Sequence, residues 1–386
     1  MKPDASPAPA GAIVTAAIGC LQPGIDPVFL TLLSDATGLD PHAHGWIVGA
    51  TQGGMAAGAL LVWRCRAFLP ARASQWAALA AVAFGLATAV IDHDPLSLLL
   101  VRCLYGGAMG VIYTEAMSTA ALHRPTGSYA AVFLTQLLLS SIVAALLPLV
   151  AHAAGPRIAL SLLALAPAIA AVLATHARPA PRPDGTAASA EDADDAIAPA
   201  AWALAFATFA FIAATMMVWS STGALAMDSG IDRNTLGVAV SAGSVIGAGT
   251  ALAVLRERRL LPLPLTGVAA GIGLLAPLAL TPSGDAALFV VAILLLNIAS
   301  TAIIVRCSGA ATAAARGALF RRFVACTHPL GMITGPVLGA VLSASAGLVA
   351  LEAGAFAVVT AGCTALIVAT SAARHRGISA DDGAVA

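Results

Sequence analysis

The feature that most constrains the fold is a series of twelve apolar segments, each long enough to cross the hydrocarbon core of a bilayer as a helix. Inside lipid only helices and closed barrels satisfy every backbone polar group, and these segments are too long for barrel strands. The sequence therefore predicts an all-α membrane protein with twelve transmembrane helices. They lie at residues 12–33, 45–63, 75–91, 96–120, 129–151, 157–176, 200–221, 235–255, 262–281, 286–305, 320–343 and 347–371.

The composition agrees with residence in a membrane and excludes several other classes of protein. The chain is 59% hydrophobic and only 10% charged, whereas about a quarter of the residues are charged in a soluble domain. Its formal net charge of zero argues against a nucleic-acid partner. The six cysteines are scattered, mostly in apolar runs and without a CxxC pair, which favours packing over a disulfide framework. We expect neither a metal nor an organic cofactor.

The basic residues predict the orientation in the membrane. If the N-terminus is cytoplasmic, sixteen of the nineteen lysines and arginines fall on cytoplasmic segments. The outer loops then hold only Arg157 and Arg233, and Arg102 lies within a spanning segment. Cytoplasmic loops of membrane proteins carry an excess of basic residues. The sequence therefore predicts cytoplasmic termini in a bacterial-type inner membrane.

One long connection divides the helices six from six. Residues 178–199 are rich in proline, alanine and acidic residues, a composition typical of a flexible tether. The expected organisation is an N-terminal half at 1–177, a cytoplasmic linker at 178–199, a C-terminal half at 200–372 and a cytoplasmic tail at 373–386. Basic loops follow both the second and the eighth segment, which is a weak indication of an internal repeat.

The fourth segment carries charges inside an apolar run. A charge within hydrocarbon costs several kcal/mol on insertion scales, so it normally has a partner or a wet cavity. Arg102, Gly106, Gly110 and Tyr113 share one helical face, while Glu115 lies on another. The glycines allow close approach of another helix. Two interpretations stay open: an arginine that reaches the interface near a helix end, or a helix that lines a solute pathway.

The chain resembles the major facilitator superfamily over essentially its whole length. The resemblance rests on the six-plus-six layout, the central linker, the basic loops and two motifs. It departs from the family after the second helix, where residues 62–66 lack the usual acidic residue and glycine, and in the fifth helix, which lacks a Gly-Pro motif. The motifs are Arg102-x-x-x-Gly106-x-x-x-Gly110 and Gly331-x-x-x-Gly335-Pro336-x-x-Gly339.

The resemblance implies two six-helix pseudo-repeats around a central cavity, lined by helices 1, 2, 4, 5, 7, 8, 10 and 11. The strongly polar side chains of the spanning segments fall mainly on these helices, as a solute pathway requires. The candidates for proton coupling are Asp26, Arg102 and Glu115, and those for the substrate cavity are Gln22, Gln52, Tyr105, Tyr113, Gln136, Asn297 and His328.

Asp26 is the foremost candidate. Residues 22–24 (Gln-Pro-Gly) precede it and Pro27 follows it, so we expect the first helix to be broken there. Asp26 and Arg102 differ by only about 4 Å in depth, so a salt bridge between them is feasible. An arginine that moves away from this carboxylate would let it take up a proton, as the resemblance implies. The alternative is a static buried ion pair that holds helices one and four together.

The other candidates each keep two interpretations. Glu115 lines the inner cavity or makes contacts near Arg124 at the cytoplasmic end. His328, followed by a proline, relays protons or binds substrate, or else it packs and donates to a carbonyl that the proline frees. Asn297 and Gln136 bind substrate or join helices by hydrogen bonds.

These features favour a proton-coupled secondary transporter of a small organic solute that works by alternating access, with export preferred to import. A uniporter or importer, a sensor that does not transport and a membrane-embedded enzyme are the alternatives. We do not expect an enzyme, because the sequence lacks HExxH, paired acidic diphosphate motifs and a GxSxG beside an oxyanion donor. No ATP-binding motif is present, so an ion gradient would drive transport. The expected partners are the lipid bilayer and the solute, with the protein working as a monomer.

Overall fold

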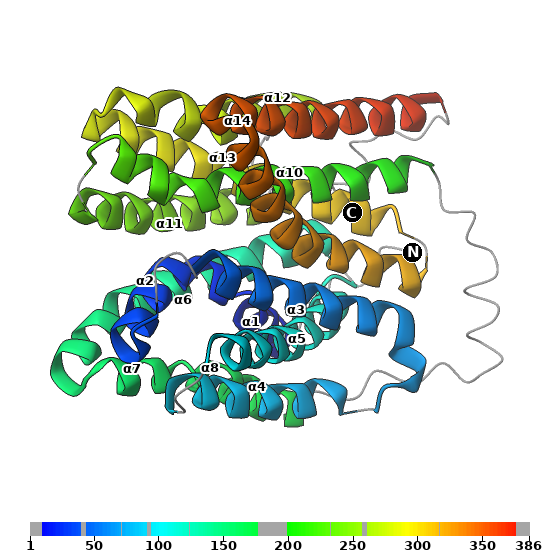
Figure 1. Ribbon diagram of the computed structural model, residues 1–386. Helices are drawn as coiled ribbons and strands as arrows, with labels where there is room; N and C mark the ends of the chain where they lie inside the picture. Colours follow the sequence, from blue (N-terminus) through cyan, green and yellow to red (C-terminus); the bar gives the residue numbers. More distant parts are fainter. Residues whose placement is uncertain are drawn as a thin grey trace. The chain divides into compact units, whose positions relative to one another are not determined.

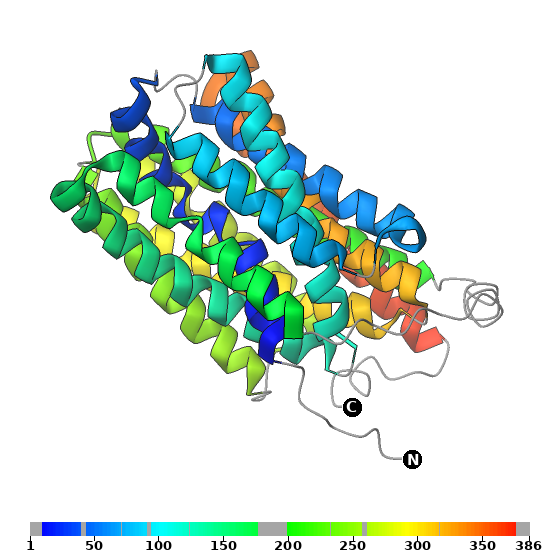
Figure 2. The same cartoon turned by 90° about the horizontal axis from the view of Figure 1, so that it is seen from below.

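The structure, a computed structural model, describes residues 10–39, 44–70, 72–90, 94–122, 124–176, 199–231, 233–256, 261–315 and 317–375. Every regular element in these ranges is helical (Figures 1 and 2). The described residues form two compact units. We call residues 10–122 with 135–176 the amino-terminal unit, and residues 199–375 with 124–134 the carboxy-terminal unit.

The amino-terminal unit contains eight helices, the sixth of which begins in the other unit. A short 3-10 turn, Arg66–Phe68, follows the third. The helices are α1 (Ala10–Gly19), α2 (Gln22–Thr37), α3 (His44–Cys65), α4 (Ala73–Val90), α5 (Pro95–Ala120), α6 (Pro125–Ala154), α7 (Pro156–Leu162) and α8 (Leu165–His176).

The carboxy-terminal unit contains five long helices and the first turns of α6. A 3-10 turn, Thr281–Ser283, follows the third of the five. They are α10 (Pro199–Asp228), α11 (Arg233–Leu255), α12 (Leu263–Leu280), α13 (Ala286–Ala313) and α14 (Ala318–His375). The predicted linker lies outside the described residues except for Pro199, and so does the tail beyond residue 375.

Eleven described stretches are long and apolar enough to span a membrane, and they match the second to twelfth predicted segments. Where the sequence predicts the first segment, α1 and α2 lie in succession. The expected break in this helix is therefore present, but it falls at Cys20–Leu21, before the Gln-Pro-Gly sequence. Pro23 stands in the first turn of α2, where its missing amide would have no helical partner in any case.

The last two predicted segments are joined in one long helical element, α14. Gly347 has a φ of 66°, a left-handed conformation that costs other residues energy, and it divides the element into two spans. Figure 1 shows the change of direction along α14. The predicted segment 157–176 is also interrupted, because α7 ends at Leu162 and α8 starts at Leu165.

Glycines set the closest helix crossing of the amino-terminal unit. A Cβ at Gly106 of α5 would overlap the backbone oxygen of Thr51 on α3, and one at Gly110 would overlap that of Met55. Gly54 of α3 approaches the backbone of Cys103 in the same way. We call this contact the α3–α5 seam. Only glycine permits such backbone proximity.

A second glycine crossing, the α10–α14 seam, lies in the carboxy-terminal unit. Gly331 approaches Ile212, and a Cβ at Gly335 would overlap the backbone oxygen of Ala213. A Cβ at Gly339 would lie 3.0 Å from the Cγ of Met217. Pro336 stands inside α14 between these glycines.

Candidate functional site

A buried polar cluster forms in the amino-terminal unit around Asp26 on α2. The Nε2 of Gln22, one turn earlier, donates a hydrogen bond of 2.8 Å to the Asp26 Oδ1. Gln52 on α3 also interacts with this carboxylate, and all three side chains are at most 9% exposed. The helix break at Cys20–Leu21 makes α2 a separate short helix, which carries Gln22 and Asp26 on one face.

Arg102 on α5 is held by neutral groups. Its Nε donates to the Thr51 Oγ1 at 3.2 Å, across the α3–α5 seam. The guanidinium carbon lies 4.4 Å from the ring centroid of Phe29 and 4.5 Å from that of Tyr105. Cation–π contacts of this kind stabilise a desolvated cation by roughly 2 kcal/mol. Arg102 is only 2% exposed, so these contacts replace water around the charge.

The feasible salt bridge between Asp26 and Arg102 is not formed. The two charges interact electrostatically, but no ion pair within 4.0 Å joins them among the described side chains. Each has other neighbours: the carboxylate accepts from Gln22, and the guanidinium donates to Thr51 and lies over two aromatic rings. Separate positions of this kind leave the carboxylate without a fixed counter-ion.

Two side chains of the cluster keep unused hydrogen-bonding capacity. Neither amide atom of Gln52 makes a hydrogen bond of good geometry, although the side chain lies beside Asp26. The Nη2 of Arg102 is likewise buried without a hydrogen bond. A buried donor or acceptor left unsatisfied costs about 1–3 kcal/mol. A ligand that bonds to these atoms would remove this cost.

A polar pair on α6 completes the surroundings of α2. The Nε2 of Gln136 donates to the Ser140 Oγ at 3.2 Å. A Cβ at Gly24 would lie 2.8 Å from that same nitrogen and would overlap the Ser140 hydroxyl. The glycine two residues before Asp26 therefore lets α6 pack directly on α2, which brings Gln136 into the neighbourhood of the cluster.

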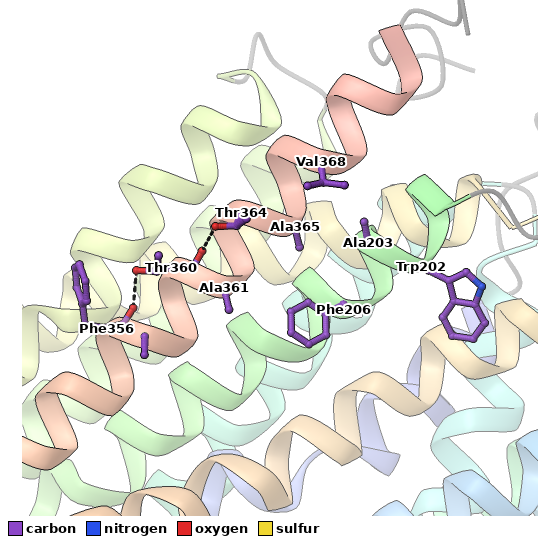
Figure 3. Close-up of a pocket in the computed structure, with 10 residues that line it drawn as sticks. Trp202, Ala203, Phe206, Phe356, Thr360, Ala361, Thr364, Ala365 and Val368 are labelled. Carbon is purple, nitrogen blue, oxygen red and sulfur yellow. Dashed lines mark hydrogen bonds between the residues drawn. The ribbon is translucent and has the colours of Figure 1, made fainter. Parts of the chain in front are cut away.

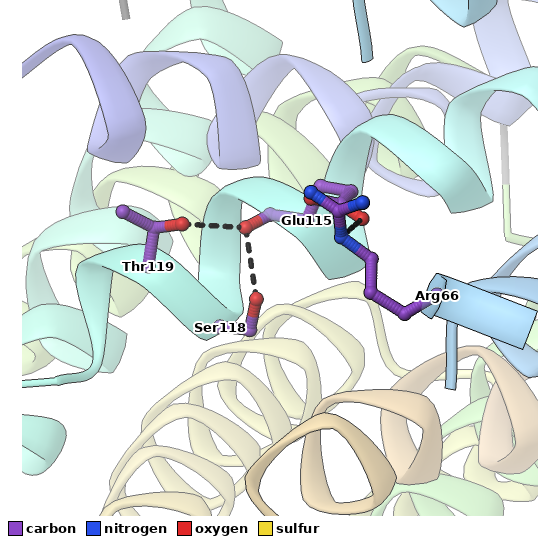
Figure 4. Close-up of polar contacts among 4 residues, drawn as sticks. All are labelled: Arg66, Glu115, Ser118 and Thr119. Atoms are coloured by element: carbon purple, nitrogen blue, oxygen red, sulfur yellow. Dashed lines mark hydrogen bonds and ion pairs between the residues drawn. The ribbon is translucent and has the colours of Figure 1, made fainter. Parts of the chain in front are cut away.

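Glu115 has a partner that the sequence analysis did not consider. Its Oε1 forms an ion pair of 2.6 Å with the Nε of Arg66, in the turn after α3 (Figure 4). The hydroxyls of Ser118 and Thr119 donate to the Glu115 backbone oxygen (Figure 4). Arg66 belongs to the loop that departs from the family motif, so this pair joins the end of α3 to α5.

The two tyrosine candidates differ in their surroundings. Tyr105 stacks on the Arg102 guanidinium and so belongs to the cluster. Tyr113 is fully buried where α5 meets α1, because a Cβ at Gly19 would lie 2.8 Å from its Cα. Tyr113 therefore packs between these two helices, and its place in the substrate cavity stays a prediction.

The remaining candidates lie in the carboxy-terminal unit and favour their packing interpretations. The Nδ2 of Asn297 on α13 donates to the Ile293 oxygen at 2.9 Å, and its Cγ would lie 3.1 Å from a Cβ at Gly243 of α11. His328 is half-buried and meets the ring of Phe133 edge to face, with centroids 5.5 Å apart. Asn297 thus packs near α11 while its hydrogen bond stays within α13, and His328 packs on the first turns of α6.

Sequence reasoning missed Thr51, Phe29 and Arg66. Phe29 is three residues after Asp26, and this helical spacing could have placed it beside the carboxylate. Thr51 could have been considered because it immediately precedes Gln52. Nothing in the sequence pairs Arg66 with Glu115, because 49 positions separate them.

An apolar groove opens between α10 and α14, with a volume of about 850 Å³ (Figure 3). The hydroxyls of Thr360 and Thr364 face it, but each donates at 2.8 Å to the carbonyl one turn earlier. The large aromatic side chains that line this groove are those of Trp202, Phe206 and Phe356. Within the described residues, no group of three or more His, Cys, Asp or Glu side chains is arranged to hold a metal ion.

Comparison with known proteins identifies the fold. No protein-family model matches the chain, and no curated protein matches it. Among solved structures, the major facilitator superfamily transporter FucP in the outward conformation is similar with a TM-score of 0.64 and 15% identity, over 93% of this chain and 98% of that one.

Two further structures support the same assignment. The proton:xylose symporter XylE has a TM-score of 0.65 and 13% identity, over 93% of this chain and 92% of that one. The human organic anion transporter MFSD10 has a TM-score of 0.63 and 14% identity, over 92% and 97%. This chain therefore has the major facilitator superfamily fold and is a multi-pass helical membrane protein.

Proposed function

We propose that this protein is a proton-coupled secondary transporter of a small organic solute, in which Asp26 carries the proton. The fold supports transport rather than catalysis, because FucP, XylE and MFSD10 are all described as transporters. The excess of basic residues on one side supports cytoplasmic termini in an inner membrane.

The observation that carries the proposal is a buried carboxylate held by a neutral amide. The Gln22 amide donates to the ionised form of Asp26, and after rotation its oxygen accepts from the protonated form. A direct arginine partner would favour only the ionised form. Asp26 thus has a hydrogen-bonding neighbour that suits both states of a proton carrier.

The charge of Arg102 makes the proton affinity of Asp26 depend on conformation. It acts on Asp26 electrostatically without a fixed bond, and its own contacts are with α2, α3 and α5. A change in the angle between α2 and α5 alters the distance between the two charges and so the proton affinity of the carboxylate. Alternating access provides such a change.

The test is solute-driven proton movement in proteoliposomes that contain a pH-sensitive dye. Wild type, Asp26→Asn and Asp94→Asn are compared on a panel of hexoses, hexitols, organic acids, amines and apolar drugs. Asp94 caps α5 from an exposed position, and asparagine caps equally well, so this variant controls for loss of an aspartate.

We expect a solute-triggered pH change in wild type and Asp94→Asn that is lost in Asp26→Asn. The sign of the pH change distinguishes symport from antiport. Equal signals in all three proteins would remove Asp26 from the mechanism, and transport without any pH change would replace the proposal by uniport.

A further inference from the structure

We propose that Gln52 and the Nη2 of Arg102 form a subsite for a neutral, polyhydroxylated solute, which they bind through neighbouring hydroxyl groups. The inference rests on the proposed function, since it takes the Asp26 cluster to be the solute site. It adds the chemical class of the solute and the groups that recognise it.

The unused atoms define what the ligand must offer. One N–H of Gln52 is directed at the Asp26 carboxylate, which leaves a second N–H donor and the acceptor oxygen of the amide, whereas the Arg102 Nη2 presents donors only. A hydroxyl accepts and donates, so it satisfies both ends of the amide. A carboxylate only accepts and an ammonium only donates, so either would leave an atom of Gln52 unsatisfied.

Both groups lie near the same carboxylate, because Gln52 and Arg102 each interact with Asp26. Across the α3–α5 seam, the Arg102 Nε donates to the Thr51 hydroxyl at 3.2 Å. The backbone of Thr51 is pressed against Gly106, so neither helix can shift without breaking that contact. Groups fixed before the ligand arrives lose little entropy on binding.

The contacts of Arg102 leave one of its donors for a ligand. The guanidinium carbon lies over the rings of Phe29 and Tyr105, 4.4 and 4.5 Å from their centroids, and Nε bonds to Thr51. Nη2 is buried without a hydrogen bond. A hydroxyl oxygen that accepts from Nη2 therefore leaves the Thr51 bond in place.

Charge balance favours a neutral ligand. The cluster holds one carboxylate, Asp26, and one guanidinium, Arg102, both buried. An anion would add a second negative charge beside Asp26, and an ammonium would add a second positive charge beside Arg102. Like charges at low dielectric repel strongly, whereas a neutral polyol leaves the balance unchanged.

The experiment measures binding to the purified full-length protein by thermal shift, with no gradient imposed. The probes are glucose, galactose and myo-inositol, the matching glucuronate and galacturonate, and hydroxyl-free hexanoate and hexylamine. The variants are Gln52→Leu and Thr88→Val. Thr88 is 2% exposed on α4 and bonds only within its own helix, to the Phe84 oxygen, so it is a matched buried control.

We expect at least one neutral polyol to stabilise wild type and Thr88→Val, and its affinity for Gln52→Leu to fall by at least about tenfold. Without ligand, a cooperative melting transition of Gln52→Leu shows that the variant is folded. Gln52→Asn, which keeps the amide one methylene shorter, should recover part of the affinity.

Three results would overturn the inference: no stabilisation by any of the neutral polyols, a preference for the uronates, hexanoate or hexylamine, or unchanged affinity in Gln52→Leu. Failure of the proposed function is recognised separately. Polyol binding that depends on Gln52, together with a pH signal that survives Asp26→Asn, would retain the subsite and discard the coupling residue. A pH signal that is driven only by hydroxyl-free solutes and is lost in Asp26→Asn would retain Asp26 as the coupling residue and discard the subsite.

Discussion

The two glycine seams use the same packing device with different surroundings. In the α3–α5 seam, Gly106 lets the backbone of Thr51 approach, and the side chains beside it include Arg102 and Gln52. In the α10–α14 seam, Gly335 lets Ala213 approach, and the atoms nearest to its glycines belong to apolar side chains and to the backbone. Close backbone contact is thus a general way to join helices, and it becomes part of a site only where polar side chains flank it.

The largest effect is expected from adding a single methyl group to each seam. Gly106→Ala and Gly335→Ala both place a Cβ against a backbone oxygen, so each should lower the free energy of unfolding by at least about 2 kcal/mol. Only Gly106→Ala should also weaken hexose binding by the folded protein, because it displaces Thr51 and Arg102. Melting temperature and affinity are measured together. Equal loss of affinity in both variants would erase the distinction between the seams.

A smaller effect is expected from removing one hydroxyl beside each seam. Thr51→Val leaves the buried Nε of Arg102 without its acceptor and should cost about 1–3 kcal/mol. Thr215 on α10 bonds only to the Phe211 oxygen of its own helix, so Thr215→Val should change stability little. Denaturant unfolding compares the two. A cost for Thr215→Val as large as that for Thr51→Val would show that the Arg102 bond adds nothing.

The smallest effect concerns the N-terminus of α5. Hydrogen bonds from the Ser97 hydroxyl and then its backbone amide hold the pKa of Asp94 below its ordinary value. Because the folded pKa is the lower one, this contribution to stability is present above the unfolded pKa and is lost as the pH falls through the folded pKa.

The measurement for this end of the helix is the melting temperature across the acidic range. Wild type should lose slightly more stability than Asp94→Asn as the pH falls, since asparagine caps without titrating. An equal fall of melting temperature with pH in the two proteins would show that titration of Asp94 does not contribute to stability.

The sequence was sufficient for the fold and for part of the site. Long apolar runs predicted the spans, because hydrocarbon leaves the backbone few alternatives to a helix. Proline and glycine near Asp26 predicted a broken first helix, although the break falls at Cys20–Leu21. Depth in the membrane made a salt bridge between Asp26 and Arg102 feasible, but the two side chains bond to Gln22 and Thr51 instead. Depth does not reveal which side chains of other helices reach each charge.

The joint between α1 and α2 has a mechanical consequence. Asp26 is five residues beyond Leu21, or about 7.5 Å along α2. A ten-degree rotation of α2 about this joint would move the carboxylate by about 1.3 Å, given that rise per residue. Displacement on that scale separates a hydrogen bond from a mere contact. A small tilt of α2 about this joint would therefore change which group the Asp26 carboxylate contacts, while α5 stays intact over its whole length.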